Sequence, residues 1–223
     1  MIDVDIPQLS SNGINFGTWC FRYTYSLQSS STHSSISSSF DATGLENYLN
    51  FGKQEPTVTS TVVRNRTEFN SIPLDVEELW IGRFDTSDIS EFTRNRFQSL
   101  KILVIGNGQF WSVNKLELKN YSSLQFIYIG DICFGNVKVF ELDGLSELES
   151  VVIGQRSFRI SGGSYRIVNC PKLKSIQIGG RSFKDYNSFE LNNLPSLQSI
   201  DIGDECFISA LLFSLTGSID GLV

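Results

Sequence analysis

The sequence predicts a mainly β fold, a parallel β-solenoid with about 24 residues per coil and two short strands per coil. The first observation behind this prediction is a phrase that recurs six times from residue 76 onward. It consists of an apolar residue, two variable residues, an apolar residue, a variable residue, isoleucine and glycine. Its copies begin at Val76, Leu100, Leu124, Leu148, Leu173 and Leu197, with successive spacings of 24, 24, 24, 25 and 24 residues.

The second observation is that apolar and variable residues alternate in the phrase and again later in each segment. Such alternation is typical of a strand with one buried face. It predicts strands near positions 2–6 and 15–19 of each segment, and runs this short need stacked neighbours to bury their apolar face. The second apolar pairs are Leu116 and Leu118, Phe140 and Leu142, Tyr165 and Ile167, Phe189 and Leu191, and Phe213 and Leu215.

A phenylalanine follows the glycine of the phrase by four residues in five of the six segments, whereas the first segment has Thr86 there. We expect these rings to form an internal ladder, and the glycine to allow a turn that a side chain would obstruct. The extra residue of the fourth segment falls at Gly162-Gly163, which we expect to absorb it. The phenylalanines are Phe110, Phe134, Phe158, Phe183 and Phe207.

The chain divides into three parts by this pattern. Residues 1–75 read as degenerate coils and an N-terminal cap, because Ile14-x-Phe16-Gly17 repeats the strand phrase and residues 58–64 are rich in β-branched side chains. The serine-rich segment 26–39 reads as a flexible insertion. Residues 76–217 hold the six repeats, and residues 218–223 read as the start of an incomplete further repeat.

No capping repeat is recognisable after residue 217. A parallel edge without a cap invites pairing with another chain. We therefore expect either a piece of a longer array or end-to-end self-association at the C-terminal edge.

The repeat phrase and the joints Asn-Cys-Pro-Lys-Leu at 169–173 and Asn-Leu-Pro-Ser-Leu at 193–197 resemble leucine-rich repeats, most closely the BspA-like repeats of protist and bacterial proteins. The resemblance covers about residues 76–217. It implies a repeat scaffold that binds other proteins. The asparagine that this family carries two residues after the strand glycine is absent, so we expect coils that stack more like a flatter β-solenoid.

Composition excludes several functional classes. A net charge of -6 argues against sequence-independent binding to nucleic acid. The single histidine, His33, lies in the serine-rich segment, and the four cysteines form no CxxC pair, so we expect no metal site and no cofactor. No stretch is long and apolar enough to span a membrane, and the N-terminus lacks the pattern of a signal peptide, which favours the cytoplasm.

The candidate site is a set of apolar residues that alternation turns outward from the first strand of the early repeats. Later repeats place polar residues at the same positions. Neighbouring outward aromatic residues are typical of a partner site. The alternative is that the N-terminal segment or another domain folds over this face. The residues are Trp80, Ile102, Val104, Phe126, Tyr128 and Val152.

The second strand carries an outward charged column of Glu117, Glu141, Arg166 and Glu190, with lysines 115, 119 and 138 alongside. Stacked carboxylates can bind calcium or serve in acid–base catalysis, but calcium needs more oxygen ligands and a glycosidase pair needs a cleft. We expect a solvated charged face.

Three functions remain open at this point. The first is a non-catalytic repeat scaffold that binds another protein through the sheet face of residues 76–152. The second, implied by the resemblance, is a piece of a surface or adhesion protein of a microbial eukaryote. The third is a carbohydrate-acting β-solenoid enzyme, which would use carboxylates such as Glu141.

Overall fold

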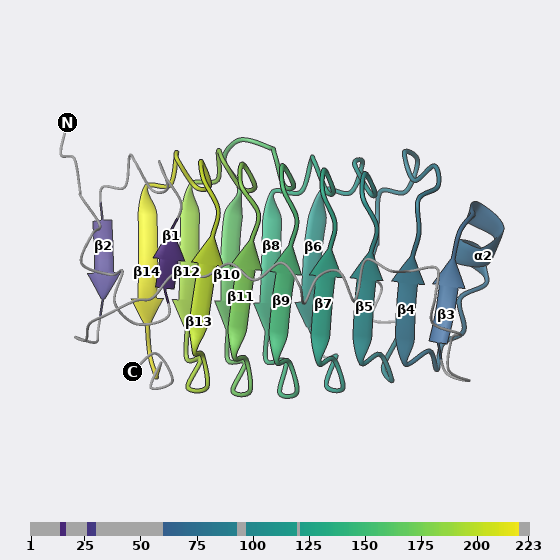
Figure 1. Cartoon of the computed structure of the whole chain (residues 1–223), viewed down its shortest axis with the longest axis horizontal. Coiled ribbons are helices and arrows are strands. Elements are labelled where there is room, and N and C mark those ends of the chain that lie inside the picture. Colours follow the sequence, from purple (N-terminus) through teal and green to yellow (C-terminus); the bar gives the residue numbers. More distant parts are fainter. Residues whose placement is uncertain (1–13, 17–25, 30–59, 93–96, 120, 219–223) are drawn as a thin grey trace.

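The computed structural model describes residues 14–16, 26–29, 60–92, 97–119 and 121–218. These residues form a parallel β-solenoid with two sheets, and each coil from β5 (Ile102–Ile105) to β14 (Leu212–Thr216) contributes one strand to each sheet (Figure 1). The predicted fold class is confirmed, with about 24 residues per coil.

The larger sheet, sheet A, is built from the first strand of each coil. Its eight strands are all parallel. In spatial order they are β1 (Ile14–Phe16), β13 (Ser199–Ile202), β11 (Ser175–Ile178), β9 (Ser150–Ile153), β7 (Phe126–Ile129), β5 (Ile102–Ile105), β4 (Glu78–Ile81) and β3 (Ser60–Val63).

The second sheet, sheet B, has six parallel strands, and among the described residues the coils of β3 and β4 contribute no strand to it. In order they are β2 (Ser26–Ser29), β14 (Leu212–Thr216), β12 (Ser188–Asn192), β10 (Ser164–Val168), β8 (Val139–Asp143) and β6 (Lys115–Lys119). The short helix α2 (Arg66–Asn70) follows β3, and Asn65 caps it by accepting a hydrogen bond from the Glu68 amide.

Equivalent residues of successive coils pair directly across the sheets, so Ile81, Ile105 and Ile129 lie in one row. The extra residue of the fourth repeat leaves both registers intact, because it lies in the turn before β10. Gly162 has a φ of +79° there. A Cβ at Gly163 would lie 2.6 Å from the Tyr186 ring, so this glycine makes room for an aromatic side chain.

The glycine after the sheet A strand of each of the six repeats allows the neighbouring coil to approach closely. A Cβ at Gly154 would lie 2.7 Å from the backbone nitrogen of Asp131 and 2.7 Å from the carbonyl carbon of Gly130. Its backbone does not adopt a positive φ. From the sequence, we expect this glycine to allow a turn. In the structure its lack of a side chain gives the coils room to stack.

The predicted phenylalanine ladder is present, and every member is fully buried. Successive rings of Phe110, Phe134, Phe158, Phe183 and Phe207 stack with centroids 5.4, 5.3, 4.4 and 5.2 Å apart and interplanar angles between 3° and 18°. A second ladder of Phe140, Tyr165, Phe189 and Phe213 stacks from sheet B at 4.9–5.2 Å. Rings of the two ladders meet edge to face, which joins the two sheets through the core.

All five phenylalanines of the first ladder have left-handed backbones, with φ between 51° and 58°. This conformation costs a residue with a Cβ roughly 1–2 kcal/mol. The ladder holds it in place because the phenylalanine amide hydrogen-bonds to the preceding coil, as Phe158 does with the Cys133 carbonyl at 3.0 Å. Ring burial offsets the strain.

Small polar side chains just before the phenylalanines connect the coils inside the core. The Ser157 hydroxyl accepts a hydrogen bond from the Cys133 amide at 3.0 Å and donates one to the Gly130 carbonyl at 3.0 Å. Ser182 repeats the pattern one coil later, accepting from the Ser157 amide at 2.9 Å and donating to Gly154 at 2.7 Å. The sequence shows the column of small residues, but not this role.

The N-terminal strands lie at the C-terminal end of the stack, where β1 pairs with β13 and β2 pairs with β14 (Figure 1). The expectation of an uncapped C-terminal edge is therefore wrong, because β13 and β14 have neighbours on both sides. The first four residues of the serine-rich segment are strand β2, whereas residues 30–39 and 219–223 lie outside the described residues. The strand expected over 58–64 is confirmed as β3, and it lies at the opposite end of sheet A.

Replacement of Phe158 by alanine should lower the free energy of unfolding by about 3–5 kcal/mol, because it opens a cavity between two stacked rings. Phe158→Gly should cost about 1 kcal/mol less than Phe158→Ala, because glycine relieves the left-handed strain. Urea unfolding of both variants measures the two effects. An alanine loss below about 1 kcal/mol would refute the ladder, and a glycine variant less stable than the alanine variant would refute the strain.

Removal of residues 1–30 should expose the outer edges of β13 and β14, and exposed parallel edges recruit other chains. We expect the truncated protein to self-associate with rising concentration and to unfold at a lower temperature than the full chain. Sedimentation velocity and thermal unfolding measure these changes. Unchanged stability together with a monomeric truncated protein would show that β1 and β2 do not cap the stack.

Candidate functional site

The six predicted site residues lie together on the outer face of sheet A. Trp80 pairs with Val104, Val104 with Tyr128, and Tyr128 with Val152, which makes one continuous column. Ile102 pairs with Phe126 in the neighbouring column. All six form an apolar cluster separate from the main core, which we name the sheet A patch.

Two kinds of exposure occur within the patch. Val104 is fully buried, and Tyr128 and Val152 are 5% and 9% exposed, whereas Trp80, Ile102 and Phe126 are half-buried. Alternation correctly predicts that these side chains point away from the main core. The middle of the patch is nevertheless buried from solvent. The alternative of cover by the N-terminal segment concerns residues that lie mostly outside the described part of the chain.

Burial also changes the chemistry of Tyr128. The pKa of its phenol is raised to about 12, mainly by desolvation and to a smaller extent by the nearby Asp131 and Cys133. The hydroxyl therefore remains protonated at neutral pH. It is a neutral group on an otherwise apolar column, and it can both donate and accept a hydrogen bond.

A pocket of about 230 Å³ continues the patch toward the turns that follow the sheet A strands. Tyr128, Val152 and Gln177 line one part of it, and Gly154 and Gly179 give it a backbone wall. Asn107 and Asp131 lie at the same pocket. The Asn107 carboxamide accepts from the Asp131 amide at 2.8 Å, and the Asp131 carboxylate accepts from the Gln155 amide at 2.7 Å.

The patch ends where the columns become polar. Ser150 and Ser175 share a hydroxyl–hydroxyl hydrogen bond of 2.8 Å, and Gln177 and Asp201 continue the column of Val152. The apolar part of the outer face thus extends from β9 through β7, β5 and β4 to β3, where the half-buried Val62 pairs with Trp80. The structure brings together all six predicted residues and adds Gln177 through the pocket.

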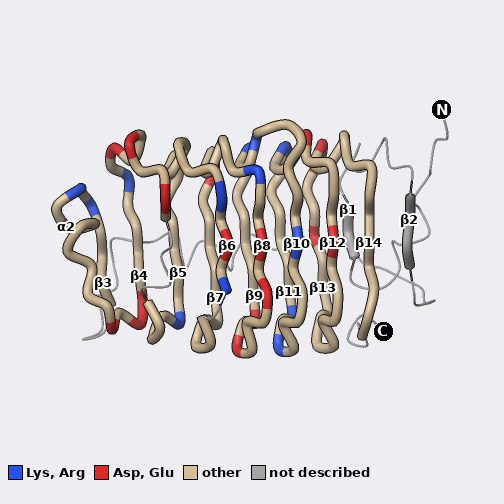
Figure 2. Tube along the Cα trace, turned by 180° about the vertical axis from the view of Figure 1, so that it is seen from behind, with Lys and Arg blue, Asp and Glu red and all other residues tan. Residues whose placement is uncertain are grey.

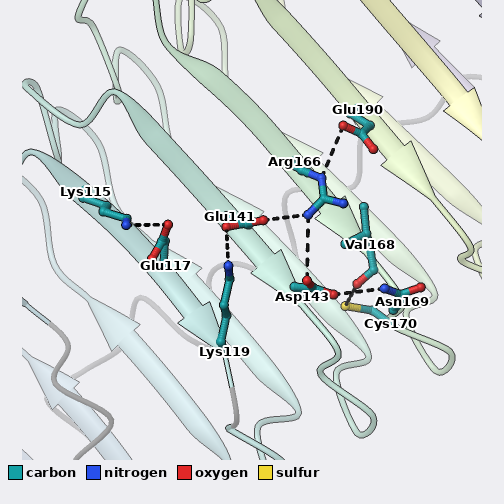
Figure 3. A network of polar contacts seen from close by, with 10 residues as sticks. All are labelled: Lys115, Glu117, Lys119, Glu141, Asp143, Arg166, Val168, Asn169, Cys170 and Glu190. Carbon is teal, nitrogen blue, oxygen red and sulfur yellow. Dashed lines mark hydrogen bonds and ion pairs between the residues drawn. The ribbon is translucent and has the colours of Figure 1, made fainter.

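The outer face of sheet B carries an ion-pair network rather than a row of repelling carboxylates (Figure 3). Arg166 contacts Glu141 at 2.6 Å, Glu190 at 3.3 Å and Asp143 at 3.8 Å. Lys119 contacts the second oxygen of Glu141 at 2.8 Å. Figure 2 shows acidic and basic residues close to one another on these strands.

Glu141 is the centre of this network, and only 13% of its side chain is exposed. Burial by itself raises its pKa, but hydrogen bonds from Lys119 and Arg166 outweigh that effect, so the pKa lies below the ordinary value. A carboxyl group held ionised by two cations is poorly suited to donate a proton at neutral pH. The geometry therefore favours a structural role for Glu141.

Cys133 and Cys170 are buried free thiols, and desolvation raises the pKa of each to about 11. Such thiols are poor nucleophiles. No group of three or more histidine, cysteine or acidic residues that could hold a metal occurs within the described ranges. No helix among the described residues has the length and apolarity needed to cross a membrane.

Comparisons of the chain with protein-family models, with curated proteins and with solved structures find no match.

Replacement of Glu141 by glutamine should lower the free energy of unfolding by about 1 kcal/mol at neutral pH, because Lys119 and Arg166 lose a shared carboxylate. Glu117→Gln is the matched control and should cost less, because its partner Lys115 is more exposed. Urea unfolding measures both variants.

The pH dependence of the free energy of unfolding gives a second test of the ion pairs of Glu141. Because the pKa of Glu141 is lowered in the folded protein, its stabilising effect is present above its unfolded value near 4.5 and is lost as pH falls through the folded value. The stability difference between the parent protein and Glu141→Gln should therefore shrink at acidic pH. A difference that stays constant would contradict the network.

Proposed function

We propose that this protein is a non-catalytic repeat scaffold that binds a protein partner through the sheet A patch. The observation that carries the proposal is the apolar cluster on the outer face, which is separate from the core and borders a pocket of about 230 Å³. Apolar and aromatic surface next to a pocket is typical of the anchoring centre of a protein interface.

The difference between the two sheets supports this choice of face. The outer face of sheet B satisfies its charges internally, so a partner there would have to break ion pairs. On sheet A, Trp80, Ile102 and Phe126 retain partial exposure beside the closed column. A partner that presents apolar side chains would bury these three residues first and could reach Tyr128 through the pocket.

We further propose kinship with leucine-rich repeats of the BspA-like type. Its support is the repeat of about 24 residues, the strand phrase ending in glycine and the parallel strand in every coil. The family's asparagine is missing, but Asn107 and Asp131, which directly follow the strand glycine, accept hydrogen bonds from the next coil. These two residues would take the place of the asparagine ladder in the turn.

A peptide-display selection against the intact protein tests the proposed binding face. We expect the selected peptides to be rich in aromatic and aliphatic residues. Their affinity should fall about 30-fold for Trp80→Ser with Tyr128→Ser and for Phe126→Ser with Val152→Ser, which is the loss expected of about 2 kcal/mol of interface energy.

The matched control is Trp111→Ser, which removes an exposed tryptophan from the turn edge and should leave peptide binding unchanged. Thermal unfolding of each variant separates binding from stability. If both double variants lose stability while peptide affinity stays constant, the patch is a covered structural face and the proposal fails.

A further inference from the structure

The turns at one edge of the solenoid form a basic groove that is separate from the sheet A patch. Its volume is about 470 Å³, within the usual range for a small-molecule site. The lining side chains, which we name the basic groove, are Arg156, Arg159, Arg181, Lys184, Asp185 and Glu205. Four of them are cationic and two are acidic, so the groove has a net charge of +2 in a chain of net charge -6.

The repeat places these cations in two short columns. Arg156 and Arg181 occupy the same position in successive coils, two residues after the first glycine that follows β9 and β11. Arg159 and Lys184 are equivalent in the same way, one residue after Phe158 and Phe183. Adjacent members of a column therefore start from backbones about one strand spacing, about 4.8 Å, apart.

The backbone that carries the first column is fixed by contacts between coils. Arg156 and Arg181 have left-handed backbones, with φ of 56° and 64°. The Arg156 amide donates to the Gly180 carbonyl at 3.0 Å, and the Arg181 amide donates to the Asp204 carbonyl at 2.7 Å. The two guanidinium groups thus project from turns that are hydrogen-bonded to the stack, which reduces the ordering cost of binding a ligand.

Only some of the cations in the groove form ion pairs with a carboxylate. Glu205 accepts hydrogen bonds from Arg181 at 2.9 Å and Lys184 at 2.9 Å, and these bonds hold its pKa below the ordinary value. Arg156 and Arg159 contact no carboxylate among the residues that the structure describes. The uncompensated positive charge is therefore concentrated at the Arg156 and Arg159 end.

We propose that the basic groove binds a ligand through a phosphate or sulfate group held by Arg156 and Arg159. Guanidinium groups match tetrahedral oxyanions because each presents several N–H donors in one plane. Arg181 and Lys184, oriented by Glu205, add positive potential from the next coil. The anion-binding site is independent of the proposed protein-binding function, because turns rather than the outer face of a sheet form it.

The test is a titration of the intact protein with inorganic phosphate and with inorganic sulfate at low ionic strength, followed by the arginine side-chain NMR signals. We expect saturable shifts of Arg156 and Arg159. Affinity should fall about tenfold or more in Arg156→Gln with Arg159→Gln, because the charge-assisted hydrogen bonds to the anion are lost. Arg159→Gln alone leaves the left-handed position untouched and should show part of the same loss.

The matched control is Lys115→Gln with Lys138→Gln, which removes the same charge from another part of the surface and should leave anion affinity unchanged. Repeating the titrations at about pH 5.5 distinguishes the two ligand sources, because phosphate loses charge near pH 6–7 whereas sulfate does not. Selective weakening of phosphate at low pH, with tighter phosphate binding at neutral pH, assigns a phosphate ligand. Tighter sulfate binding at both values assigns a sulfate ligand.

Three results would overturn the proposal. One is the absence of saturable binding of either anion by the parent protein. Another is equal affinity in the parent and in the double arginine variant. The third is an equal loss in the lysine control, which would show a general effect of net charge.

Discussion

The stacking of each coil on an equivalent coil is the constraint on which the rest of this structure depends. Parallel pairing places every residue directly beside the residue one repeat away. A side chain is therefore acceptable only if it can lie next to a copy of its own position. Flat aromatic rings meet this condition by stacking, and the serine hydroxyls meet it by hydrogen-bonding to the backbone of the neighbouring coil.

The same constraint explains how charged residues are arranged on sheet B. A column of identical carboxylates would repel at one strand spacing. Arg166 interrupts the column, and Lys119 reaches Glu141 from the adjacent row. The outer faces of the two sheets consequently differ. On sheet B, charged side chains form ion pairs between neighbouring strands, whereas sheet A carries an apolar cluster. A solenoid of uniform coils can in this way present different chemistry on each face.

Much of the fold could be predicted from the sequence, because strand periodicity and repeat length are local properties. The pairing of Phe158 with its neighbours follows from repeat spacing alone. Its left-handed backbone does not, because phenylalanine has no preference for that region. A related signal exists two residues earlier in the segment, where Gly108 stands in the column of Arg156 and Arg181 and shares their positive φ.

The candidate site could also be predicted in part from the sequence. Alternation gives the direction of Val104 and Tyr128, but their burial depends on what packs around them in three dimensions. The phrase at Ile14–Phe16 predicts a strand, but both ends of a parallel stack offer the same kind of edge. Only the assembled structure shows that this strand joins β13.

The pairing of β1 with β13 links residues that are far apart in the sequence, such as Ile14 and Ile200. During synthesis on a ribosome, β1 is made well before β13 and has to wait for it. Repeats 76–217 can stack progressively as they emerge, because their contacts are between neighbours. The rung of β1 can form only after β13 has been made, and this non-local step adds an N-terminal strand to the C-terminal end of an otherwise one-dimensional array.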